Sequence, residues 1–108
     1  MLQELDVHVV ETGRVHRVVG AASVAQAVFA VATAACWVVA GPDWAPLRVG
    51  YAADHDALTV VDLRGDARVV DLTSVILYST SKGRLGVSKY RLLDAARAAC
   101  VNGRRLGS

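Results

Sequence analysis

Valine-rich stretches that alternate hydrophobic and polar residues open the chain and predict β-strands. The first stretch, Leu5–Glu11, alternates with a period of two, as a strand with one buried face does. Arg14–Val19 repeats the pattern, and Thr12–Gly13 between the two stretches is a turn signal. The two segments are therefore predicted to form an antiparallel hairpin.

A long segment without charged side chains follows, and its alanine content predicts a helix. Val18–Pro42 contains no Asp, Glu, Lys or Arg. Alanine is the strongest helix former, and Ser23 is a suitable N-cap. Gly41–Pro46 carries one glycine and two prolines, which are helix stop signals. We therefore expect a helix that begins at residue 21 or 22 and ends near Ala40.

Three further strands are predicted in the second half of the chain. Ala57–Leu63 and Ala67–Leu72 are apolar and are separated by the turn Arg64–Asp66, which indicates a second hairpin. The denser apolar run Ser74–Thr80 is typical of a central strand that is covered on both faces. Leu47–Asp56 is either a short edge strand or an ordered loop, so the strand register from Leu47 to Leu72 stays open.

The chain ends in a predicted amphipathic helix over residues 87–100, after a break at Ser81–Gly86. One side of this helix is apolar and the other side is charged. The apolar side consists of Leu85, Leu92, Leu93, Ala96 and Cys100, and the charged side of Lys89, Arg91, Asp94 and Arg97. The element order β-β-α-β-β-β-α predicts an α+β fold in a single domain over residues 1–108. We expect a five-stranded antiparallel sheet with a long central helix and a C-terminal helix.

The uncharged segment is long enough to cross a bilayer, which takes about 20 apolar residues, so two interpretations compete. Two observations argue against a membrane span: the segment contains neither Leu nor Ile, and it lies between predicted strands that must pair with each other. Its more polar positions fall on one helical stripe, formed by Ser23, Gln26, Ala30, Thr33 and Trp37. We therefore expect a helix that lies on the sheet and contacts another subunit, with a membrane span as the alternative.

Composition and charge narrow the range of functions. The 108 residues carry a net charge of +2, but residues 1–81 hold 5 basic and 9 acidic side chains, whereas residues 82–108 hold 7 basic and 1 acidic. A basic C-terminal third can face an acidic partner. Tyr90 is the one aromatic residue among these basic residues, which argues against a base-stacking surface and a nucleic acid partner. The acidic N-terminus is not typical of a signal peptide, and the two cysteines suit a reducing, cytoplasmic setting.

The sequence lacks motifs for catalysis or metal binding. It contains no phosphate-binding loop of the form G-x-x-x-x-G-K-[ST] and no G-x-S-x-G nucleophile elbow. The imidazoles are His8, His16 and His55. Neighbouring side chains in Asp54–Asp56 point in different directions, and Cys36 and Cys100 lie too far apart in sequence to form a zinc-binding pair. We therefore expect no metal, no cofactor and no catalytic residue, and interpret Arg64–Asp66 as a hairpin turn.

The stretch Ala57–Ala99 resembles the second half of the Roadblock/dynein light chain domain, a family that includes the bacterial MglB-like proteins. That half has two strands joined by a turn, an apolar strand, a Gly-containing break and a final helix. Gly83–Ala99, GRLGVSKYRLLDAARAA, takes the place of the break and the helix. The resemblance implies a Roadblock/profilin-like fold whose long central helix packs against its twin in a homodimer. Two features depart from the family pattern: no helix precedes the first strand, and residues 43–56 form a longer connection than usual.

The resemblance also implies a function, that of a non-catalytic, cytoplasmic homodimer that regulates or scaffolds a small Ras-like GTPase. The expected dimer interface on the central helix consists of Ala22, Gln26, Phe29, Ala30, Thr33, Ala34 and Trp37. The expected contacts to an acidic partner surface are Arg84, Lys89 and Arg91. The alternatives are a single-span membrane protein with a small cytosolic β-rich domain and a structural assembly subunit.

Overall fold

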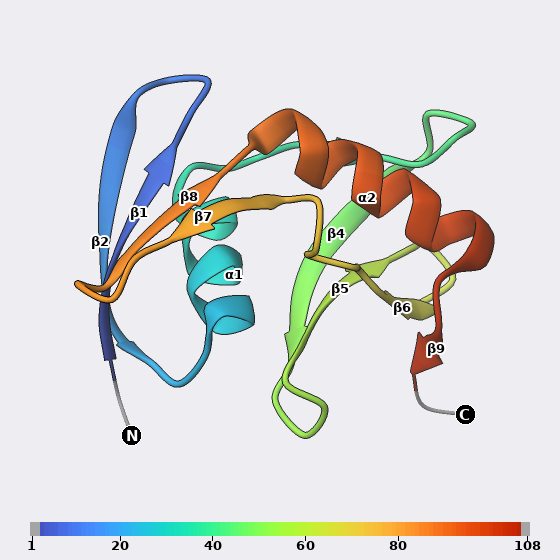
Figure 1. The fold of residues 1–108 in the computed structure, drawn as a ribbon. Coiled ribbons are helices and arrows are strands. Elements are labelled where there is room, and N and C mark those ends of the chain that lie inside the picture. Colours follow the sequence, from blue (N-terminus) through green and yellow to red (C-terminus); the bar gives the residue numbers. More distant parts are fainter. Residues whose placement is uncertain (1–2, 107–108) are drawn as a thin grey trace.

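The computed structural model describes residues 3–106, which form an α+β fold of two β-sheets and two helices (Figure 1). The first sheet contains β1 (Gln3–Val9), β2 (Arg14–Ala21), β7 (Ile76–Ser79) and β8 (Arg84–Val87). The second sheet contains β3 (Val39–Ala40), β4 (Pro46–Ala52), β5 (Ala57–Val61), β6 (Ala67–Val69) and β9 (Arg105–Leu106). The helices are α1 (Val24–Ala34) and α2 (Lys89–Asn102). The expected α+β class is confirmed, but the strands form two sheets where a single five-stranded antiparallel sheet was predicted.

The first sheet has the strand order β2-β1-β8-β7 and contains one parallel pair. β1 and β2 form the antiparallel hairpin that the alternating pattern predicts, with Val7 opposite His16. β1 also pairs in parallel with β8, where Val7 lies beside Leu85. The second half of the chain thus adds two strands to the N-terminal hairpin, which is why the expected single sheet divides in two.

The second sheet is antiparallel throughout, with the strand order β3-β4-β5-β6-β9. Residues 46–52 are a strand, β4, which places Gly50 opposite Thr59 of β5. The predicted β5–β6 hairpin is confirmed, with Val61 opposite Ala67. β9 follows α2 and pairs with β6, so the last described strand forms one edge of this sheet.

Residues 84–87 form a strand inside the first sheet, although the sequence predicted a break there. Leu85 is buried in this strand, so it does not belong to the final helix. Ser74–Thr80 was predicted to be a central strand, but it contributes the short edge strand β7. Gly86 permits this arrangement, because a Cβ at this position would lie 2.2 Å from the ring of Tyr78. The ring of Tyr78 therefore packs directly on the backbone of β8.

Helix α1 ends at Ala34 and does not continue to Ala40 as predicted. It stops in a Schellman motif, in which the N–H groups of Cys36 and Trp37 donate to carbonyl oxygens in the last turn of the helix. Cys36 adopts the left-handed conformation with a φ of 54°. Glycine usually occupies this position, so the sequence pointed to Gly41 as the stop signal and missed the earlier one.

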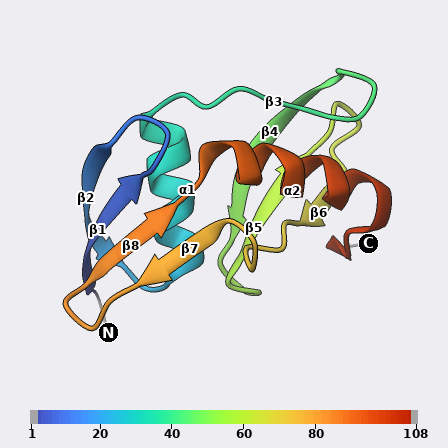
Figure 2. The same ribbon diagram turned by 45° about the horizontal axis from the view of Figure 1, so that its top comes forward.

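The core lies around α1, which sits between the two sheets and contacts β1, β2, β4 and β5 (Figure 1). α2 packs against β3, β5 and β6, and Figure 2 shows it in front of the second sheet. The largest buried side chains of the core are Val7, Val9, Val28, Val31, Val39, Leu58, Val75, Leu85, Val87 and Leu92. A large part of the uncharged segment is therefore covered by its own chain.

Candidate interaction surfaces

The dimer interface predicted on the central helix is only partly exposed, and two of its members, Ala22 and Trp37, lie outside α1. Its exposed members are Ala22, Thr33 and Ala34, and its half-buried members are Gln26, Phe29, Ala30 and Trp37. Phe29 stacks on Tyr51 of β4 with ring centroids 6.1 Å apart, and Trp37 packs against the core. A groove of 280 Å³ between β2 and α1 includes Ala30 and Ala34 in its lining. The two largest side chains of the predicted interface, Phe29 and Trp37, thus contact their own chain, and mainly small side chains face outward.

The three basic residues predicted to contact a partner do not form one cluster. Arg84 is exposed at the start of β8, whereas Lys89 and Arg91 lie in the first turn of α2. The length of β8 separates them by about 13 Å, since a strand rises about 3.3 Å per residue. Lys89 and Arg91 are close in sequence, but residues two positions apart point to different sides of a helix, so the structure does not join any two of the three into one surface.

Glu11, in the turn between β1 and β2, binds the N-terminus of α2. Its carboxylate accepts hydrogen bonds from the Ser88 hydroxyl and, at 2.7 Å, from the Lys89 N–H. Desolvation by burial acts to raise the pKa of Glu11, but the bonds from Ser88 and Lys89 outweigh it and the pKa is lowered. The negative charge also lies where the helix dipole favours an anion. Because 77 residues separate Glu11 from Ser88, no local pattern predicted this contact.

The outer side of α2 carries two exposed apolar side chains with two charged side chains between them. We call this set, Tyr90, Asp94, Arg97 and Val101, the α2 stripe. Steps of four, three and four residues place its members on one side of the helix. Tyr90 and Val101 are 65% and 73% exposed. The sequence correctly placed Asp94 and Arg97 on the side away from the core.

Trp44 lies against Arg97 and enlarges this surface. The guanidinium carbon of Arg97 is 4.7 Å from the centroid of the Trp44 ring, and its Nε donates to the Ala40 carbonyl at 3.3 Å. Trp44 is nevertheless 74% exposed and has a φ of 63°, which bulky residues rarely adopt. The tight loop between β3 and β4 holds it, since the Trp44 N–H donates to the Gly41 carbonyl at 2.9 Å. Sequence reasoning missed this contact, because no periodic pattern marks a loop tryptophan.

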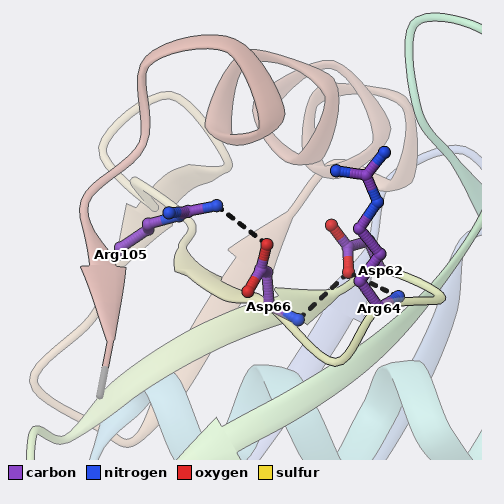
Figure 3. Close-up of polar contacts among 4 residues, drawn as sticks. All are labelled: Asp62, Arg64, Asp66 and Arg105. Atoms are coloured by element: carbon purple, nitrogen blue, oxygen red, sulfur yellow. Dashed lines mark hydrogen bonds and ion pairs between the residues drawn. The ribbon is translucent and has the colours of Figure 1, made fainter. Parts of the chain in front are cut away.

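The turn between β5 and β6 stands near the C-terminal end of α2. Asp62 Oδ1 accepts the N–H groups of Arg64 and Asp66 at 2.9 and 3.0 Å, and the Asp66 carboxylate pairs with Arg105 at 2.8 Å (Figure 3). The interpretation of residues 64–66 as a hairpin turn is thus confirmed. The ion pair to Arg105 also attaches β9 to this turn.

A groove of 490 Å³ separates this turn from the loop that carries Trp44. Leu63, which is 80% exposed, lies on one side of the groove, and Cys100 of α2 is part of its lining. Desolvation by burial raises the pKa of the Cys100 thiol, which makes it a poor nucleophile near neutral pH. The groove therefore offers apolar contact area and not a reactive thiol.

A small polar network joins the N-terminus of α1 to the turn after β4. The Asp56 carboxylate accepts hydrogen bonds from the Ser23 hydroxyl and, at 2.6 Å, from the Tyr51 hydroxyl. These bonds, that of Ser23 first, lower the pKa of Asp56, and the Asp56 carboxylate raises the pKa of Tyr51. Asp56 has a φ of 47°, so the network fixes a tight turn. Across residues 3–106, no three His, Cys, Asp or Glu side chains gather in a way that could hold a metal ion.

Comparisons of the chain with protein-family models, with curated proteins and with solved structures give no match. Neither helix in the described part of the chain has the length and apolar character needed to cross a bilayer. The surfaces of the chain itself, above all those around α2, are therefore the basis for a functional proposal.

Proposed function

We propose that this chain is a cytoplasmic protein-interaction module that works as a homodimer and performs no chemistry of its own. The observation that carries the proposal is the apolar surface along and beside α2. Its members are Trp44, Leu63, Tyr90 and Val101, each at least 65% exposed. Large apolar side chains gathered on one surface are typical of protein–protein contacts, and Trp and Tyr are enriched in such contacts.

The interface predicted from the sequence on the central helix is the second candidate for the dimer interface. Phe29 and Trp37 already pack on their own chain, so a contact through α1 would bury mainly the small side chains of Ala30, Thr33 and Ala34. Burial stabilises by about 0.8 kcal/mol per CH₂ group, so small side chains contribute little each. The surface around α2 carries the large exposed side chains of Trp44 and Tyr90 and is therefore the first candidate.

A small Ras-like GTPase is the partner that the resemblance of Ala57–Ala99 to Roadblock proteins supports. The two-sheet arrangement differs from the single sheet that the resemblance implies, so the exposed surface is the stronger support for an interaction module. Lys89 and Arg91 would contact an acidic surface of the GTPase. Such a partner can be regulated through the ordering of its own switch loops, without a catalytic residue from this chain.

Two measurements test these proposals separately. Light scattering coupled to size-exclusion chromatography, without detergent, should give twice the mass of one chain. A calorimetric titration should show binding to a small Ras-like GTPase loaded with a non-hydrolysable GTP analogue, and Arg91→Glu should weaken it. Arg104→Glu is the matched control, because Arg104 is exposed outside α2. A monomer contradicts the homodimer, no binding contradicts the GTPase, and equal effects of the two variants contradict the partner contact through Arg91.

The two alternative functions give different results in simple fractionation experiments. A single-span membrane protein would stay with the membranes during a carbonate wash, whereas the proposed module should leave with the supernatant. A structural assembly subunit would give species much larger than a dimer in the light-scattering experiment.

A further inference from the structure

We infer that two copies of the chain pair through the α2 stripe in an antiparallel arrangement. The two-fold axis of this pair would cross α2 between Ala95 and Ala96. The inference rests on the proposed homodimer and names its surface: the α2 stripe of each copy is covered by the α2 stripe of the other. An isologous contact of this kind is the commonest way in which a homodimer forms.

The spacing of the α2 stripe is that of a coiled-coil seam. Its four residues follow one another by four, three and four positions, which is the spacing of the a and d positions in a heptad repeat. Side chains at these positions meet the side chains of a neighbouring helix. α2 has 14 residues, and at 1.5 Å per residue it offers a contact about 21 Å long.

The charges of the α2 stripe match in this arrangement. In this arrangement each residue faces the residue of the other copy that lies at the same distance on the opposite side of the axis. Asp94 of each copy therefore faces Arg97 of the other, which gives two ion pairs. The same symmetry places Tyr90 of one copy against Val101 of the other at both ends of the contact. Each ion pair would then lie beside an apolar contact. A parallel pairing would instead place Asp94 against Asp94 and Arg97 against Arg97, and like charges would repel.

Arg97 is held in a position that suits this contact. Its Nε donates to the Ala40 carbonyl and its guanidinium lies over the ring of Trp44. A guanidinium has five N–H donors, so four remain for a carboxylate. No ion pair within residues 3–106 includes Asp94 or Arg97. Trp44 would also cover one side of the intermolecular ion pair and reduce its contact with water.

Charge reversal tests the pairing directly. Asp94→Arg and Arg97→Asp each create two like-charge contacts in the proposed dimer, and each should raise the Kd of dimerisation about 100-fold or more. Asp54→Arg and Lys82→Asp are the matched controls, because they make the same charge changes at exposed positions outside α2. Both controls should leave the Kd unchanged in light scattering.

Mixing the variants gives a second, more specific test. An equimolar mixture of the Asp94→Arg and Arg97→Asp chains should form a heterodimer, because both contacts then join opposite charges. The double variant should form a homodimer but no heterodimer with the wild-type chain. Native mass spectrometry distinguishes the homodimers and the heterodimer of the two single variants by their masses. The double variant has the same mass as the wild type, so the wild-type chain is labelled with ¹⁵N in that mixture.

The outcomes separate this inference from the proposed function. A monomeric wild-type chain contradicts the homodimer and the pairing together. A wild-type dimer that both charge reversals leave intact keeps the homodimer and refutes the pairing through α2. If circular dichroism shows that a reversal fails to fold, Tyr90→Lys and Val101→Asp replace the pair, since both side chains are exposed. Their mixture should dimerise more tightly than either chain alone, and equal Kd values would overturn the inference.

Discussion

Gly86→Ala should destabilise the protein, because the added methyl group would collide with the ring of Tyr78. A Cβ at Gly86 would lie 2.2 Å from Tyr78 Cε1, far inside a normal contact. The ring would have to leave the surface of β8. Tyr78 would then lose its packing and the hydrogen bond of 2.8 Å between its hydroxyl and His8 Nδ1.

The size of the destabilisation follows from the buried surface area that the Tyr78 ring loses. Tyr78 is 37% exposed, so somewhat more than half of its surface is covered in the folded protein. A tyrosine can bury about 200 Å², so the loss is about 120 Å² and costs about 3 kcal/mol at 25 cal/mol per Å². New contacts of the displaced ring and the better strand propensity of alanine offset part of this cost. We therefore expect a loss of about 2–3 kcal/mol in the free energy of unfolding.

Urea denaturation followed by circular dichroism measures this loss, and the background Tyr78→Ala tests its cause. With a urea m-value of about 1.5 kcal/mol/M, the midpoint should fall by about 1.3–2 M. In the Tyr78→Ala background no ring remains to collide with residue 86, so Gly86→Ala should cost close to nothing there. An equal cost in both backgrounds would show that the collision is not the cause.

Three further predictions concern single side chains. Because the pKa of Glu11 is lowered in the folded protein, its carboxylate stabilises the fold above the unfolded pKa of about 4.3, and this stabilisation is lost as the pH falls through the folded pKa. The urea midpoint of the wild type should therefore drop more steeply below pH 5 than the midpoint of Glu11→Gln. Parallel curves for the two proteins would contradict this. Cys36→Gly should raise the free energy of unfolding by about 1 kcal/mol, because glycine adopts a φ of 54° without strain, whereas Cys36→Ala should give no gain. A maleimide should react faster with exposed Cys36 than with Cys100, whose pKa is raised by desolvation. The Cys100→Ser chain reports the rate of Cys36, and the Cys36→Ser chain reports the rate of Cys100. A faster reaction of the Cys36→Ser chain would refute this prediction.

The two hairpins could be predicted from the sequence because their strands are neighbours in the chain. Alternation over Leu5–Glu11 and Arg14–Val19, with a glycine turn between them, specifies both the strands and their pairing. The same holds for β5 and β6 around Gly65. In both cases the local pattern and the tertiary structure agree.

The sheet arrangement could not be predicted, because it depends on pairs that are distant in sequence. The four residues of β8, Arg-Leu-Gly-Val, show no alternation long enough to predict a strand, and their parallel partner is β1. The predicted length of α1 was wrong for another reason: Cys36 adopts the left-handed conformation that glycine usually adopts at the end of a helix. β-Branched Val38 and Val39 then leave the helix, and Val39 pairs with Leu47 of β4.

Only part of the candidate surfaces could be predicted from the sequence. Helical periodicity placed Asp94 and Arg97 on the outer side of the last helix, and they lie there. The contact of Trp44 with Arg97 depends on how a loop folds over α2, and no pattern in either segment encodes it. The interface on α1 stays a prediction, although the structure turns Phe29 and Trp37 toward the core.

The parallel pair of β1 and β8 sets an order of events during synthesis on the ribosome. Asp6 faces Arg84 in this pair, so β1 gains its second neighbour only after about 80 further residues have been translated, which takes roughly 4–16 s at 5–20 residues per second. Throughout this interval the edge of β1 that later pairs with β8 stays open on the nascent chain, beside Val7 and Val9, which are buried in the finished protein. The N-terminal hairpin is therefore the segment that a nascent-chain chaperone would have to shield for longest.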